Sequence, residues 1–238
     1  MTPVLELRDV SRCYDDGAGE VAALSSVSLS VAAGELVAVM GPSGSGKSTL
    51  LQLAGGLDRP TDGRVLVDGR DLADLSTRAL AALRRRRVGY VFQRLNLLAS
   101  LTAVENVMLP LELDGIGARG ARAAAEEALA QVGFSGSTKR FPDDLSGGEQ
   151  QRVAIARGVV GERALLLADE PTGALDTVGG EAILELLSAR RDAGAEVVLV
   201  THEPRFAGWA DRVLFLRDGQ VVDEAVARSG AATLASRR

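Results

Sequence analysis

Short apolar runs alternate with longer amphipathic stretches along this chain of 238 residues. Runs rich in Val and Leu that are bounded by polar or Gly-containing segments predict strands, and the amphipathic stretches between them predict helices. The predicted strands are residues 4–10, 27–31, 36–40, 65–67, 88–92, 165–168, 197–201, 213–216 and 221–222. Strands that alternate with helices in this way are typical of an α/β fold with a largely parallel sheet.

Strand signals stop between Gln93 and Asp144. This region instead has the pattern of helices at residues 102–113 and 121–133, which indicates a helical subdomain inserted into the α/β chain. Two Asp-Gly pairs, at 68–69 and 218–219, predict tight turns, and the second lies in a predicted hairpin. From residue 227 onward the sequence is small or polar, and we expect a loosely held tail.

Composition narrows the possible functions. A hydrophobic content of 46% with 25% charged residues is ordinary for a globular protein, and the net charge of −5 argues against broad binding to nucleic acid. The single cysteine, Cys13, excludes an intrachain disulfide; it is either a packed thiol or a reactive one. The sequence starts without a signal-peptide pattern and has no apolar run of about 20 residues, so work at a membrane would need a separate anchor.

Four consecutive arginines at 84–87 allow two interpretations. They could form a nucleic-acid patch or targeting signal, or they could be the solvated end of a helix that precedes the strand at 88–92. The acidic balance of the chain and the favourable placement of cations at a helix C-terminus favour the second interpretation.

The stretch "GPSGSGKS" fits the pattern G-x-x-x-x-G-K-[ST], follows an apolar strand directly and leads into a helical pattern. Glycines let the backbone wrap closely around a polyphosphate, and the start of the helix favours negative charge. In such a loop Lys47 would reach the β- and γ-phosphates and Ser48 would bind Mg²⁺. The predicted nucleotide-binding residues here are Gly41, Pro42, Ser43, Gly44, Ser45, Gly46, Lys47, Ser48 and Thr49.

A second candidate lies in "LLLADEP", where an apolar strand ends in two carboxylates. The carboxyl edge of a parallel sheet is also where the phosphate loop would lie. We expect Asp169 to hold Mg²⁺ through water and Glu170 to polarise the attacking water. The alternative is an acidic pair that only caps the next element. The neighbouring phosphate loop argues against this alternative.

The stretch "LSGGEQQRVAIAR" resembles the signature of ATP-binding cassette (ABC) ATPases. Ser146 and Glu149 also fit a capping box, so these residues could simply begin a helix. The two interpretations are compatible because the free N–H groups at a helix start form an anion site. The resemblance implies that Ser146, Gly147, Gly148 and Glu149 bind ATP held by another subunit.

The resemblance extends from about residue 4 to 224 and implies four further roles. Tyr14 matches the aromatic residue that stacks on adenine, although one aromatic residue near a strand end is often only packed. Gln93 matches the glutamine that contacts Mg²⁺ and water, and Asp176 matches an aspartate that communicates across the dimer. His202, the single histidine, matches the switch histidine that contacts the γ-phosphate; the alternative is a packed histidine in the core.

The family also implies a fold. The expected architecture is that of a P-loop NTPase with a mainly parallel core sheet, antiparallel N-terminal strands and the helical subdomain after Gln93. The chain would form one ATPase domain, with core parts at 1–92 and 160–226, the helical subdomain at 93–159 and the tail beyond.

The segments "LNLLASLTAVENVMLPLEL", "FPDDLSGGEQQRVAIAR" and "LLLADEPTGALD" resemble the lipoprotein-release and macrolide-export group. Arg94 and Ala99 depart from what is common there, which leaves the partner's identity open. The group implies a head-to-tail homodimer around two ATP that drives a separate transmembrane permease, for export or mechanical work outside the cytoplasm. Such a subunit lies peripherally on the cytoplasmic face of a bacterial membrane.

Three other functions have to be weighed against this one. They are the ATPase of an importer, a soluble cassette ATPase that serves no transporter, and a small-molecule P-loop kinase. Soluble proteins of this kind usually contain two cassettes or a long coiled-coil insertion, whereas this chain has one cassette and a short helical insertion. A kinase would lack "LSGGE". The cargo is not encoded in an ATPase subunit, so the sequence does not identify the transported substrate.

Overall fold

The computed structural model describes residues 3–15, 17 and 19–226, and the predicted tail lies outside this range. The strands are β1 Leu5–Asp15, β2 Glu20–Val31, β3 Leu36–Met40, β4 Asp62–Val67, β5 Arg70–Asp71, β6 Val88–Val91, β7 Leu165–Asp169, β8 Glu196–Val200, β9 Arg212–Arg217 and β10 Gln220–Val226. The helices are α1 Lys47–Ala54, α2 Thr77–Arg87, α3 Ala103–Leu113, α4 Ala118–Gln131, α5 Gly147–Val159, α6 Thr177–Asp192 and α7 Pro204–Ala207, with short 3₁₀ helices at Leu72–Asp74 and Pro142–Asp144.

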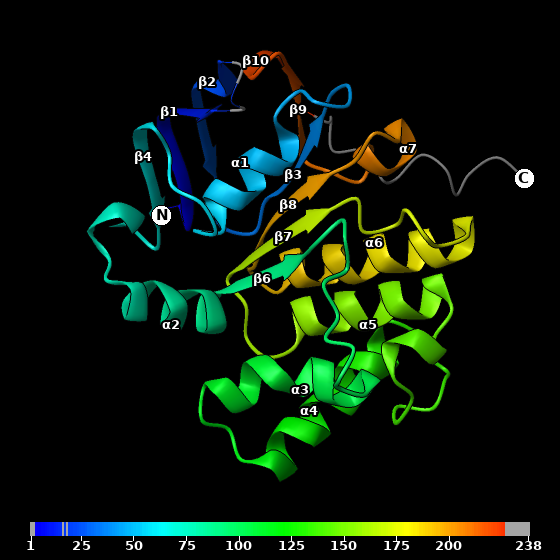
Figure 1. Ribbon diagram of the computed structural model, residues 1–238. Helices are drawn as coiled ribbons and strands as arrows, with labels where there is room; N and C mark the ends of the chain where they lie inside the picture. Colours follow the sequence, from blue (N-terminus) through cyan, green and yellow to red (C-terminus); the bar gives the residue numbers. More distant parts are fainter. Residues whose placement is uncertain (1–2, 16, 18, 227–238) are drawn as a thin grey trace, which may run out of the picture.

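The larger sheet has the strand order β10-β9-β3-β8-β7-β6, and every neighbouring pair except β10 and β9 is parallel. Its central strands are covered on both faces (Figure 1), as their continuous apolar sequences predicted. Along β3, Val37 and Val39 pack with α1 and the smaller sheet, whereas Leu36 and Ala38 pack with the helices on the opposite face. The predicted mainly parallel core is therefore confirmed.

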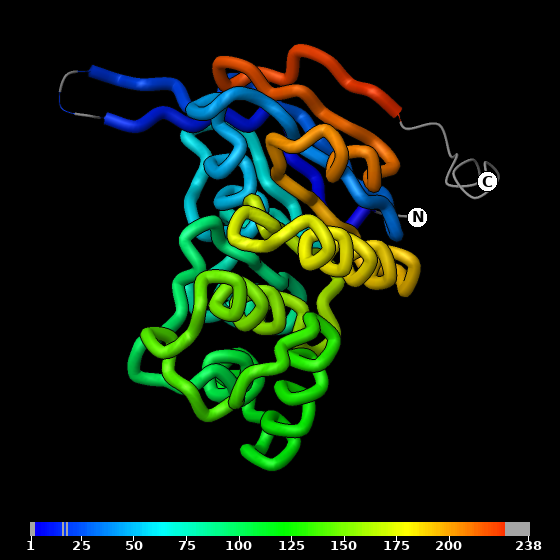
Figure 2. Tube along the Cα trace, turned by 90° about the vertical axis from the view of Figure 1, so that its right-hand side faces the viewer, coloured from blue at the N-terminus to red at the C-terminus, as the bar shows by residue number. Residues whose placement is uncertain are grey.

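The smaller sheet is antiparallel with the order β2-β1-β4-β5, as expected for the N-terminal strands. The predicted strands at 4–10 and 27–31 were too short. The apolar alternation ends before the hydrogen-bonded pairing does, and the pairing continues from Val10 and Val27 to Asp15 and Glu20 through several register shifts. This extended hairpin projects beyond the rest of the molecule (Figure 2).

The region between the core strands β6 and β7 is helical, as predicted. Helices α3, α4 and α5 pack together beside the core (Figure 1). The predicted helix at 102–113 matches α3, and α4 begins three residues earlier than the predicted start at 121. Within the described part of the chain, no helix has both the length and the apolar character needed to cross a membrane.

The arginines at 84–87 form the last turn of α2, directly before β6, so the helix-end interpretation is confirmed. Arg84 donates to the Gly56 carbonyl at 2.7 Å, and Arg86 pairs with Asp114 at 2.6 Å. These contacts lie within the chain and attach α2 to its neighbours.

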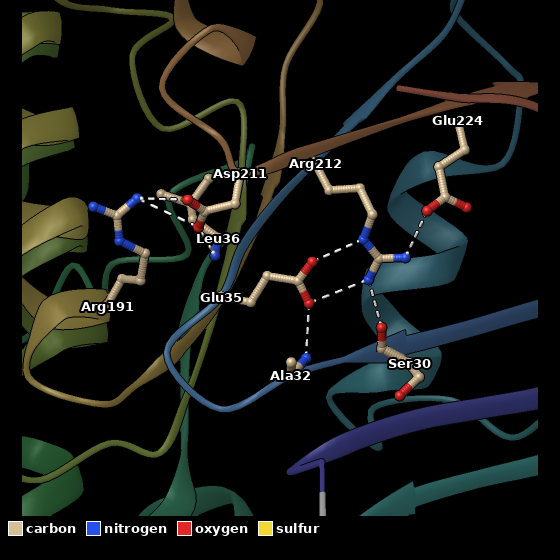
Figure 3. A network of polar contacts seen from close by, with 8 residues as sticks. All are labelled: Ser30, Ala32, Glu35, Leu36, Arg191, Asp211, Arg212 and Glu224. Atoms are coloured by element: carbon tan, nitrogen blue, oxygen red, sulfur yellow. Dashed lines mark hydrogen bonds and ion pairs between the residues drawn. The ribbon is translucent and has the colours of Figure 1, made fainter. Parts of the chain in front are cut away.

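A polar network at the amino ends of the core strands joins β9 to the turn before β3 (Figure 3). Arg212 lies between two carboxylates, Glu35 at 2.8 Å and Glu224 at 3.0 Å. The adjacent Asp211 accepts a hydrogen bond from the Leu36 amide at 2.9 Å. These contacts hold the amino ends of β3 and β9 together, and the carboxyl ends of the parallel strands point to the opposite edge.

Candidate functional site

Residues that follow four parallel strands meet at the carboxyl edge of the larger sheet. The glycine loop follows β3, Gln93 follows β6, Glu170 follows β7 and His202 follows β8. They surround a cavity of about 550 Å³. The lining residues are Ala23, Gly41, Pro42, Ser43, Gly44, Gly46, Lys47, Ser48, Thr49, Gln93, Asp169, Glu170 and His202.

The glycine loop passes close to the backbone of two other strands. A Cβ atom on Gly41 would lie 2.0 Å from the Leu216 carbonyl oxygen, and one on Gly46 would lie 2.3 Å from the Ala23 carbonyl oxygen. Gly46 also has a φ of 101°, a conformation that favours glycine. Only glycine therefore allows the loop to take this course into the start of α1.

Lys47 lies at the first turn of α1 and reaches back over the loop. Its Nζ donates to the carbonyls of Gly41 at 2.9 Å and Pro42 at 2.8 Å. Ser45, also predicted to bind nucleotide, is buried and does not line the cavity; its hydroxyl has no hydrogen-bond partner within the described residues. Free N–H groups at a helix start together with a lysine form a site for a polyphosphate.

Three oxygen-bearing side chains in the cavity fit Mg²⁺. Ser48, Gln93 and Asp169 all line it, and hydroxyl, amide and carboxylate oxygens are the ligands that Mg²⁺ prefers. Burial raises the pKa of Asp169 and the charge of Glu170 adds to this, whereas the Ser48 hydrogen bond and Lys47 lower it. Among the described residues, no three acidic, His or Cys side chains form a metal cluster.

Glu170 and His202 are in direct contact. The His202 Nδ1 lies 2.8 Å from the Glu170 Oε1. This hydrogen bond and the charge of Glu170 raise the pKa of His202. The His202 side chain is 67% exposed, whereas Val197 and Val200 on β8 are fully buried, so the histidine lies outside the core.

The backbone of Glu170 takes an uncommon conformation. Its φ of 49° lies in the left-handed region, which costs a residue with a side chain on the order of 1 kcal/mol. A hydrogen bond from its amide to the Val200 carbonyl, at 3.0 Å, continues the pairing of β7 with β8 and holds the residue in place. The carboxylate is thereby directed toward the cavity and His202 rather than along the strand.

The predicted signature residues lie elsewhere. Ser146 caps α5, and its hydroxyl accepts from the Glu149 amide at 3.3 Å, while Glu149 accepts from the Ser146 amide at 2.9 Å. This confirms the capping box. The Ser146 amide, the Arg140 guanidinium and the Ser146 hydroxyl all donate to the Glu149 carboxylate and lower its pKa. Ser146, Gly147, Gly148 and Glu149 do not line the cavity. Their contact with a nucleotide of a second copy stays a prediction.

Two further predicted residues are not in the cavity lining. Asp176 caps α6 by accepting from the Gly179 amide at 2.8 Å. The Tyr14 hydroxyl donates to Asp58 at 2.8 Å, and the Arg12 guanidinium lies 4.4 Å from its ring centre. The roles of Asp176 at a dimer contact and of Tyr14 at adenine therefore stay predictions.

The sequence analysis missed Ala23 in the cavity lining. This residue lies on β2 of the smaller sheet, and its carbonyl oxygen faces Gly46 at the start of α1. No motif marks it, because the contact depends on how the smaller sheet packs on α1. Ala23 contributes backbone and a small side chain to the wall of the cavity.

Comparisons with known proteins agree with this architecture. The model of the family described as "ABC transporter" matches residues 24–173. The macrolide export ATP-binding/permease protein MacB of Escherichia coli (strain K12) is 46% identical over 222 residues, which is 93% of this chain and 34% of that protein. The corresponding protein of Salmonella typhimurium (strain LT2) is 47% identical over the same length. The chain thus spans about a third of the length of these relatives.

A solved structure is similar over nearly its whole length. The dimeric ATP-binding cassette MJ0796 in a post-hydrolysis state, bound to ADP and Pi, superposes with a TM-score of 0.91 at 41% identity. The match covers 94% of this chain and 99% of that one. The predicted P-loop NTPase fold and the resemblance to macrolide exporters are therefore confirmed for the cassette. With the phosphate loop, the acidic strand end and the histidine at one edge of its sheet, the chain belongs to the ABC transporter family and has the structure of its ATPase cassette.

Proposed function

We propose that this cassette binds ATP with Mg²⁺ and hydrolyses it to drive a membrane partner. The observation that carries the proposal is the shared cavity, in which Glu170 and His202 lie 2.8 Å apart opposite the complete phosphate loop. A nucleotide-binding protein without catalysis would not need a carboxylate and an imidazole in contact at this position.

Lys47 and the amides at the start of α1 bind the phosphates, and Ser48, Gln93 and Asp169 would hold Mg²⁺. When bound, Mg²⁺ neutralises charge that develops on the phosphate oxygens. Glu170 accepts the proton of the attacking water.

His202 keeps the Glu170 carboxylate in position through Nδ1, and its Nε2 remains available for the γ-phosphate. The raised pKa of His202 favours the form in which both ring nitrogens are donors. Only this form can donate to Glu170 and to the γ-phosphate at the same time, so the hydrogen bond to Glu170 also prepares His202 for the phosphate.

Phosphate release by the purified chain tests the proposal. We expect release to require both ATP and Mg²⁺, and to stop when the metal is chelated. ATP binding without any phosphate release, in the presence of Mg²⁺ and at protein concentrations that allow pairing, would contradict catalysis by the isolated cassette.

We propose further that two copies pair head to tail. Ser146 and Asp176 lie at the starts of α5 and α6, away from their own cavity, so they would need a second chain to reach a nucleotide. The dimeric state of the similar cassette MJ0796 supports this arrangement. Light scattering should give twice the monomer mass for Glu170→Gln with ATP and the monomer mass without it. A monomer under both conditions would contradict the pairing.

The partner that we propose is a separate transmembrane permease, with the cassette on the cytoplasmic face of a bacterial membrane. The similar proteins of Escherichia coli and Salmonella typhimurium are named as ATP-binding/permease proteins, which supports export or mechanical work outside the cytoplasm. Affinity purification from membranes tests this. A permease with a large external domain supports the proposal, a permease with a solute-binding protein indicates an importer, and recovery without any membrane protein indicates a soluble cassette.

A further inference from the structure

The segment between β6 and α3, which contains Gln93 as its second residue, has no regular secondary structure. Side chains of the helical region hold its backbone. At its far end the buried Asn106 of α3 accepts from the Leu98 amide at 2.8 Å and donates to the carbonyls of Leu101 at 3.0 Å and Thr102 at 3.1 Å. The near end, next to Gln93, is held by a different residue.

Arg157 in the last turn of α5 holds the near end. Its Nη1 donates to the Asn96 carbonyl at 2.6 Å and its Nη2 donates to the Leu95 carbonyl at 2.6 Å. The planar guanidinium matches two successive carbonyls, a geometry that a lysine ammonium cannot reproduce. Asn96 has a φ of 50°, so the chain turns sharply at the residue whose carbonyl accepts from Arg157.

This contact gains little stability, because burying the Arg157 guanidinium has a desolvation cost. Arg157 is partly buried, and burial lowers its pKa. No carboxylate pairs with it among the residues that the structure describes. An apolar side chain would pack at this position without the desolvation cost of an unpaired cation. The specific geometry of the Leu95 and Asn96 carbonyls therefore gives a better reason for an arginine here than stability does.

Gln93 has little else to determine where its side chain lies. It is exposed, and its side chain makes no hydrogen bond with the described part of the chain. On one side β6 ends at Val91 in the core sheet, and on the other side Leu95 is attached to α5. The position of Gln93 in the cavity thus depends on where β6 and Arg157 place its backbone.

We propose that Arg157 is a positioning residue for hydrolysis. By donating hydrogen bonds to the Leu95 and Asn96 carbonyls, it holds Gln93 at the Mg²⁺ and water site. Because Arg157 and Ser146 lie at opposite ends of α5, the same helix that presents the signature residues also sets the position of Gln93. This inference rests on the proposed ATP hydrolysis and concerns Arg157 only through Gln93.

A double-mutant cycle between Arg157→Met and Gln93→Ala tests the inference in the full chain. Arg157→Met keeps the length and apolar stem of the side chain and removes both donors. We expect kcat to fall by about 10-fold or more, with the KM for ATP changed by less than about 3-fold. In the Gln93→Ala background the same substitution should change kcat by less than about 2-fold, because the group it positions is already absent.

Arg163→Met is the matched control. Arg163 is also partly buried, its pKa is also lowered by burial, and it donates to the Arg85 carbonyl, which is remote from Gln93. Thermal unfolding should show a comparable loss of stability for both arginine variants, and kcat should fall only for Arg157→Met. If Arg157→Met does not fold, Arg157→Lys replaces it in the cycle, because it keeps the charge and loses the planar fork.

Two outcomes would overturn the inference. Effects on kcat that multiply in the double variant would show that Arg157 acts independently of Gln93. An equal fall of kcat in Arg163→Met would show that any buried arginine gives the effect through stability. Both comparisons of kcat require an active wild-type chain. An inactive wild-type chain would contradict the proposed function itself, and this inference with it.

Discussion

Replacing Glu196 by glutamine should change how folding stability depends on pH. Glu196 begins β8 and is fully buried at the edge of the sheet opposite the nucleotide cavity. Its carboxylate accepts hydrogen bonds from the amides of Val4 at 2.6 Å and Leu5 at 2.9 Å, and so attaches the start of β1 to the core sheet. The substitution keeps the size of the side chain and removes its ability to ionise.

The magnitude follows from the environment of this carboxyl group. Burial raises the pKa of Glu196 from 4.5 to about 7, the two amide bonds oppose the rise, and the nearby Asp68 and Glu35 add to it. Because the folded state holds the proton more tightly than the unfolded state, this contribution to stability is complete below pH 4.5 and is lost as the pH rises through 7. At about 1.4 kcal/mol per pKa unit, a rise of about 2.5 units corresponds to a loss of at most about 3.5 kcal/mol.

Urea unfolding at several pH values between 5 and 8 measures this effect. The free energy of unfolding of the wild type should fall with rising pH relative to that of Glu196→Gln, and the difference should change by up to about 3 kcal/mol across the range. Glu181→Gln, at an exposed position on α6, is the control and should follow the wild type. Parallel curves for the wild type and Glu196→Gln would refute the reasoning.

Three further predictions concern the site. His202→Ala should lower phosphate release by about 100-fold and change the free energy of unfolding by less than about 0.5 kcal/mol, because the side chain is 67% exposed; large unfolding with normal turnover would show a packing role instead. Lys47→Ala should weaken ATP binding by about 10-fold or more in a fluorescence titration, and an unchanged affinity would contradict its phosphate contact. Gly46→Ala should lower stability in thermal denaturation by more than about 2 kcal/mol because its Cβ would lie 2.3 Å from the Ala23 carbonyl, whereas Gly44→Ala, which has free space, should cost less; equal losses would contradict the steric argument.

Local sequence patterns were sufficient for the parallel core. Strands β3, β7 and β8 are continuous apolar runs, and their contiguous motifs place Lys47, Asp169 and Glu170 at one edge. The hairpin of β1 and β2 was predicted too short because its outer half pairs through backbone hydrogen bonds without an alternating apolar pattern. The start of α4 was also predicted too late, since its first turn contributes no buried side chain before Ala121.

Contacts between distant segments were not predictable in detail. The 2.8 Å contact of Glu170 with His202 depends on the parallel pairing of β7 with β8, which brings together residues that are 32 positions apart. The position of Ala23 in the cavity lining and the hydrogen bond from Arg157 to the Leu95 carbonyl depend on packing between elements that share no local motif. Sequence spacing identified which residues carry the chemistry, and tertiary packing determines which of them touch.

Phosphate release by Glu170→Gln at saturating ATP and Mg²⁺ tests the central claim most directly. Glu203→Gln is a suitable control, because this neighbouring carboxylate does not line the cavity and pairs with Arg205. We expect Glu170→Gln to bind ATP with unchanged affinity and to release phosphate about 100-fold more slowly than the wild type, while Glu203→Gln remains active. Wild-type rates in Glu170→Gln would contradict its role as the base and, with it, the proposed mechanism of hydrolysis.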